Sequence, residues 1–138
     1  MTISAFGRIR IGVAFAAAFL AATANAPATD SGPRRDVAAI RRLLTHAGGR
    51  CPMSVPTVAT SGNFALATVE ERGVCDIASV TVLKRAAGTW RSLGGIGGVP
   101  DACGVHAKGV PLADSATLVR RFTGSNDPSL VSTAHCKP

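Results

Sequence analysis

The chain has 138 residues, and its 15 basic and 8 acidic residues give a formal net charge of +7. This length excludes a large multidomain protein and allows one domain with a modest core. The apolar fraction of 46% is inflated by the N-terminal segment, so it does not indicate a membrane protein. The excess of basic over acidic residues is compatible with an anionic partner, or with a charged surface that only keeps the protein in solution.

The first 28 residues have the layout of a secretory signal peptide. Arg8 and Arg10 precede the uncharged apolar run 13–22, and small residues follow that run. The run is shorter than the roughly 20 apolar residues that a membrane-spanning helix needs. Cleavage is expected before Asn25 or before Thr29, which leaves residues 29–138 as a single small domain. The predicted location is the periplasm or the extracellular space, reached by the general secretion route.

Residues 33–47 have the pattern of an amphipathic helix. Val37, Ile40 and Leu44 recur on one face at helical spacing. Proline at position 33 suits a first helical turn, and the glycine pair 48–49 ends the segment. The basic residues on this helix form a candidate site for an anion or a partner protein. They are Arg34, Arg35, Arg41 and Arg42.

The middle of the chain changes to strand patterning. Four segments have strand character: Ser54–Thr60, Phe64–Glu71, Ile77–Arg85 and Thr89–Leu93. The short links between them predict hairpins, and therefore an antiparallel meander of about four strands. Pro56 has no N–H to donate to a ladder, so the first segment is expected at a sheet edge.

The last third of the chain predicts a loop, a helix and a tail. The glycine-rich stretch 94–100 is expected to be an irregular loop, and the segment Leu112–Phe122 has helical spacing. An irregular tail then leads to Cys136. The predicted fold class is α+β, with an N-terminal helix, the meander and a C-terminal helix. We expect two layers, in which helices cover one face of the sheet.

The segment from Asn63 to Pro100 resembles a pattern found in small exported bacterial proteins of unknown function. That pattern has two strands, a turn ending in Gly-x-Trp, a glycine-rich run, a cysteine and a proline. The matching residues are Phe64, Ala65, Val80, Val82, Leu83, Gly88, Trp90, Arg91, Gly94, Gly95, Cys103 and Pro111. The resemblance supports the fold and implies no activity.

All four cysteines lie in the mature part, which predicts two disulfides in an exported domain. The meander returns Cys75 to the sheet edge at which Cys51 enters. The fourth strand ends at the same edge, so geometry alone leaves Cys103 open as a partner for either residue. A bond from Cys103 to Cys136 would close the loop that holds the second helix. We therefore predict the pairs Cys51–Cys75 and Cys103–Cys136.

No segment of the chain has a trusted catalytic or cofactor motif. The glycine run lacks the third glycine of a dinucleotide fingerprint and the Gly-Lys-Ser/Thr of a P-loop. The cysteine intervals are too wide for a zinc site built from paired ligands. We therefore predict no cofactor and no metal. If the protein were a hydrolase, the residues to suspect would be Asp101, His106 and Lys108.

The leading functional hypothesis is an exported, non-enzymatic binding module that inhibits or chaperones another envelope or extracellular protein. A small secreted hydrolase is the first alternative, and a basic protein that binds a polyanion or the envelope is the second. Export and the absence of tyrosine argue against nucleic acid as the partner, because single strands are bound by stacking on aromatic side chains.

Overall fold

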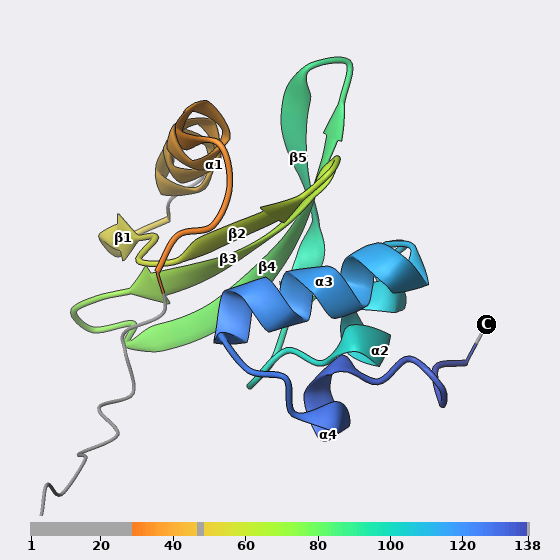
Figure 1. Ribbon diagram of the computed structural model, residues 1–138. Coiled ribbons are helices and arrows are strands. Elements are labelled where there is room, and N and C mark those ends of the chain that lie inside the picture. Colours follow the sequence, from red (N-terminus) through yellow and green to blue (C-terminus); the bar gives the residue numbers. More distant parts are fainter. Residues whose placement is uncertain (1–28, 47–48, 138) are drawn as a thin grey trace, which may run out of the picture.

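The protein has an α+β fold in a computed structural model that describes residues 29–46 and 49–137 (Figure 1). The expected signal peptide, residues 1–28, lies outside the described residues. The elements in chain order are α1 (Arg34–His46), β1 (Met53–Ser54), β2 (Val58–Ser61), β3 (Phe64–Glu71), β4 (Ile77–Ala86), β5 (Thr89–Ile96), α2 (Ala102–His106), α3 (Leu112–Thr123) and α4 (Pro128–Val131).

The five strands form one antiparallel sheet in which β3 is central. The strand order is β1-β3-β4-β5, and β2 also pairs with β3. Tight turns join the strands. In the β4–β5 hairpin, both Ala87 and Gly88 have positive φ values, 49° and 77°, as a type I′ turn requires. The prediction of a single first strand over Ser54–Thr60 was wrong. Two short strands flank Pro56, which cannot donate to the ladder of β3.

The molecule has three layers rather than the predicted two. Alternate residues of β3 point to opposite faces, and both sets are buried. Ala65 and Ala67 pack in a core with the apolar residues of α1. Phe64 and Leu66 pack in a second core with α2 and α3. Helix α1 therefore covers one face of the sheet, and α3 covers the other (Figure 1).

The prediction that the whole stretch 94–100 is a loop was also wrong. Strand β5 continues to Ile96, which pairs with Val80 of β4. The register shifts so that Leu93 is the extra residue of a β-bulge. Gly94 follows the bulge with a φ of +118°, a conformation that favours glycine. The glycine at this position therefore allows the strand to recover its pairing after the bulge.

The chain after β5 contains two short helices that we did not predict. Helix α2 begins after Asp101, whose carboxylate accepts a hydrogen bond from the Gly104 amide at 2.9 Å. Helix α3 ends at Gly124 in the left-handed conformation, as a glycine after a helix commonly does. The tail is not wholly irregular, because Asp127 caps α4 by accepting from the Ser129 amide at 2.9 Å.

The structure contains two disulfides, and their connectivity is the predicted one. Cys51 is joined to Cys75, with the Cα atoms 6.2 Å apart, and Cys103 is joined to Cys136, with the Cα atoms 4.9 Å apart. The first bond fastens the entry of β1 to the β3–β4 turn, and the second fastens the tail to α2. Disulfides of this kind fit a periplasmic or extracellular protein. Among the described residues, no helix has the length and apolar character needed to cross a membrane.

Candidate binding site

The segment that precedes α1 is fixed to the sheet by an arginine of the same helix. The Arg41 guanidinium pairs with Asp30 at 2.8 Å and donates through Nε to the Val55 carbonyl at 2.9 Å. Oδ1 of Asp30 also accepts from the Val58 amide at 3.0 Å. Ser31 then forms a parallel bridge with Ala59 of β2. Arg41 is one of the predicted binding residues, and in the structure its charge is compensated by Asp30.

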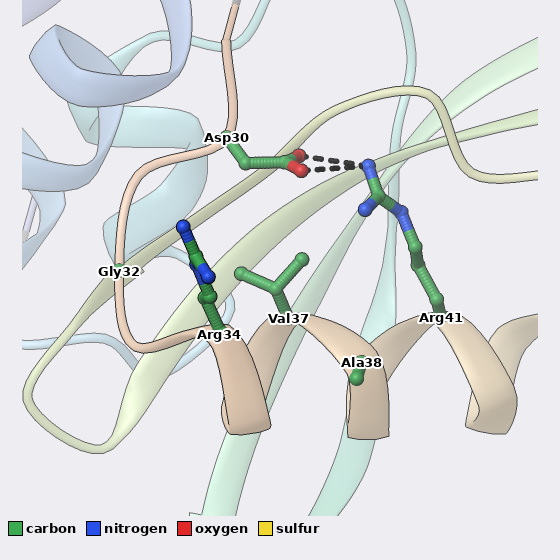
Figure 2. A pocket seen from close by; sticks show the side chains of 6 residues that line it. All are labelled: Asp30, Gly32, Arg34, Val37, Ala38 and Arg41. Atoms are coloured by element: carbon green, nitrogen blue, oxygen red, sulfur yellow. Dashed lines mark hydrogen bonds and ion pairs between the residues drawn. The ribbon is translucent and has the colours of Figure 1, made fainter.

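A pocket of about 450 Å³ opens between this N-terminal segment and α1. Figure 2 shows Val37 on the α1 surface between Arg34 and Arg41, with Asp30 across from it. The residues that line the pocket are Asp30, Gly32, Arg34, Val37, Ala38 and Arg41. The structure thus places two of the four predicted arginines, Arg34 and Arg41, at one cavity. The volume is in the range of small-molecule sites.

The remaining two predicted arginines, Arg35 and Arg42, lie on the exposed face of α1. They are seven residues apart, so they fall on nearly the same side of the helix. Within residues 29–46 and 49–137, no acidic side chain forms an ion pair with Arg34, Arg35 or Arg42. We call Arg35 and Arg42 the outer pair. These two side chains are available to an external carboxylate.

A buried ion pair that the sequence did not reveal holds the other side of α1. Asp36, in the first turn of the helix, is only 7% exposed and pairs with Arg85 of β4 at 3.1 Å. The Arg85 guanidinium also lies 5.4 Å from the centre of the buried Trp90 ring. No local pattern marks this contact, because Asp36 and Arg85 are 49 positions apart. The pair sets the position of α1 over the sheet, and therefore the position of the pocket.

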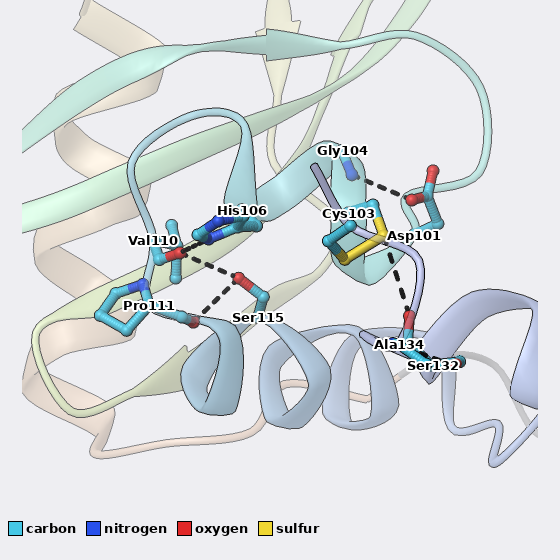
Figure 3. The surroundings of a disulfide bond; sticks show 10 residues. Asp101, Cys103, Gly104, His106, Val110, Pro111, Ser115, Ser132 and Ala134 are labelled. Atoms are coloured by element: carbon cyan, nitrogen blue, oxygen red, sulfur yellow. Dashed lines mark hydrogen bonds between the residues drawn. A yellow bond between two sulfur atoms is a disulfide. The ribbon is translucent and has the colours of Figure 1, made fainter. Parts of the chain in front are cut away.

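The residues considered for a hydrolase do not form a nucleophile–base arrangement. Figure 3 shows that Asp101 accepts from the Gly104 amide while Nδ1 of His106 contacts the Val110 carbonyl at 2.7 Å. Cys103 is bonded to Cys136 and is not a free thiol. The Lys108 ammonium lies near Gly94 of β5. Each contact that these residues make is structural.

Two other features were considered as sites. A smaller cavity of about 230 Å³ is lined by uncharged residues of β3 and β4 together with Gly98. Glu71 has a carboxylate oxygen within 4.8 Å of the sulfur atoms of Cys51 and Cys75. Metal binding by cysteine requires thiolates, and these two sulfurs form a disulfide. Neither feature offers both the charge and the volume of the pocket beside α1.

Comparison with known protein families, with characterised proteins and with solved structures finds no match for this chain. We therefore infer function from the geometry of α1 and its surroundings.

Proposed function

We propose that this protein is an exported binding module that holds an acidic protein partner through the exposed face of α1. The observation that carries the proposal is the outer pair, Arg35 and Arg42, which is exposed and has no acidic partner in the described part of the chain. A guanidinium makes paired, charge-assisted hydrogen bonds to a carboxylate, so arginine suits a protein interface. The two disulfides support an export role.

The apolar face of α1 argues for a protein partner over a membrane. An interfacial helix binds a membrane by inserting its apolar side chains beneath the headgroups. In α1 those side chains, Val37, Ile40 and Leu44, are buried against the sheet. They can be inserted only if the core opens. Leu43 is the one large apolar side chain of α1 that is exposed, so the helix offers charge with little apolar surface, which suits a carboxylate-bearing protein surface.

A short fluorescent poly-L-glutamate peptide is a direct probe of this proposal. We expect the exported protein to bind the peptide, and binding to weaken as ionic strength rises, because salt screens exposed charges. The variant R35Q/R42Q should bind about three- to tenfold more weakly, as expected for two exposed ion pairs. The matched control R91Q/R120Q removes the same charge from exposed positions away from α1.

The two variants separate a specific site from general attraction. An equal loss of binding in R35Q/R42Q and R91Q/R120Q would show that only the net charge matters, and the proposal would be wrong. A second arm uses phosphatidylglycerol vesicles. Tighter binding to vesicles than to the peptide, with the same dependence on the outer pair, would replace the protein partner by a membrane.

A further inference from the structure

We propose that the pocket beside α1 is a separate site for a carboxylate that carries a compact aliphatic group. This inference goes beyond the proposed function and does not depend on it. The outer pair lies outside the pocket, whose free cation is Arg34. The cavity of about 450 Å³ is large enough for one ligand of the size of an amino acid, together with the water molecules that contact it.

The charges in the pocket select for an anion. Arg34 and Arg41 each contribute one positive charge, and Asp30 contributes one negative charge. The Asp30 carboxylate is already occupied by Arg41, at 2.8 Å and 2.9 Å, and by the Val58 amide. Arg34 has no ion pair within residues 29–46 and 49–137. One monovalent carboxylate would therefore neutralise the pocket.

The geometry of Arg41 adds a second set of donors. Its Nε and Nη2 atoms donate to Val55, Pro56 and Asp30, and these bonds fix the plane of the guanidinium. Nη1 makes no hydrogen bond among the described residues, so its two N–H groups remain to be used. In Figure 2 the Arg34 side chain and the Arg41 guanidinium rise from α1 on either side of Val37. A carboxylate between them would accept from both.

The pocket wall limits the body of the ligand. Val37 and Ala38 supply the apolar part of the lining, and Gly32 supplies backbone without a side chain. These residues suit a short branched aliphatic group and leave no buried polar group for a sugar or a base. Two kinds of ligand combine a carboxylate with such an aliphatic group: the C-terminal residue of a protein chain, and a free aliphatic acid.

The test titrates the exported protein with three probes and follows the backbone amides of Gly32 and Ala38 by NMR. The probes are N-acetyl-L-valine, its uncharged carboxamide, and isovalerate. We expect N-acetyl-L-valine to bind and the carboxamide to show no saturable binding. The variant R34Q should weaken binding about tenfold or more, because a hydrogen bond to a charged group is lost. The control variant R120Q, on the exposed surface of α3, should leave the affinity unchanged.

The probes also identify the source of the carboxylate. Binding of N-acetyl-L-valine well above that of isovalerate assigns the site to a chain terminus, and equal binding assigns it to free aliphatic acids. Equal binding of the acid and the carboxamide, or equal loss in R34Q and R120Q, would overturn the proposal. These results are independent of the poly-glutamate experiment, which reports on Arg35 and Arg42. Either proposal can therefore fail while the other stands.

Discussion

Nη1 of Arg85 lies 3.1 Å from both carboxylate oxygens of Asp36, and this buried contact joins the first turn of α1 to strand β4. The side chain of Asp36 is 10% exposed, and that of Arg85 is 27% exposed. Each charge is therefore largely withdrawn from water and depends on the other for compensation. The contact fixes the helix that carries both proposed binding surfaces.

Removing the Asp36 charge should destabilise the domain. In D36N, the half-buried guanidinium of Arg85 loses its compensating carboxylate, so we expect a loss of about 2 kcal/mol in the free energy of unfolding. Urea denaturation followed by Trp90 fluorescence measures this loss. The control D76N changes an exposed carboxylate and should fall within about 0.5 kcal/mol of the original protein. Equal stability of the two variants would show that the pair contributes nothing.

Gly32 is required by the close approach of the N-terminal segment to β2. A Cβ at this position would lie 2.0 Å from Oγ1 of Thr60, and the φ of +133° is one that other residues rarely adopt. We expect G32A to lower the free energy of unfolding by about 2 kcal/mol or more. The N-terminal segment would have to move away from the Thr60 side chain, and the backbone at position 32 would have to change conformation. The control G49A meets no atom within 4 Å and should be nearly neutral. Thermal unfolding of the two variants makes the comparison.

Loss of the second disulfide should release the tail without unfolding the sheet. Replacing Cys103 and Cys136 together by serine removes a bond between residues that are 33 positions apart in the sequence. We expect the free energy of unfolding to fall by about 3 kcal/mol. Hydrogen exchange should speed up most in α4 and after it, where no residue is fully buried. Faster exchange in β3 than in α4 would show instead that this bond supports the core.

Asp127 should titrate below its ordinary range. The hydrogen bond from the Ser129 amide stabilises the carboxylate and lowers the pKa of Asp127 from 3.8. A lowered folded-state pKa means that the cap contributes fully above pH 3.8 and is lost as the pH falls through the folded value. The Ser129 amide shift should report this transition in an NMR titration. A midpoint at or above 3.8 would contradict the capping geometry.

Local patterns in the sequence predicted much of the secondary structure. The alternation from Phe64 to Glu71 predicted β3 with its observed bounds, because side chains two residues apart lie on the same face of a strand. The return of the meander brought Cys75 close to Cys51 but left Cys103 open as a partner, and sequence spacing decided the predicted pairing. The same stretch contained a signal for the third layer that we missed. Both alternating sets of β3 are apolar, which indicates burial on both faces.

The candidate site was less predictable, because long-range contacts decide the role of each arginine. The four arginines of α1 are alike in sequence, yet Arg41 is compensated by Asp30 and Arg34 is not. That difference depends on the N-terminal segment returning to β2, a contact between residues nearly thirty positions apart. No periodicity reports such a contact. The pocket it creates could be found only in the folded structure.

The most direct test of the proposed function is photocrosslinking in the cells that produce the protein. Thr45 on α1 is exposed and its hydroxyl donates to carbonyls of its own helix, so it can be replaced by a photoreactive p-benzoylphenylalanine. We expect a defined crosslink to an acidic protein that disappears in R35Q/R42Q and persists in R91Q/R120Q. A crosslink that persists in R35Q/R42Q, or one that forms only to lipid, would contradict the proposed function.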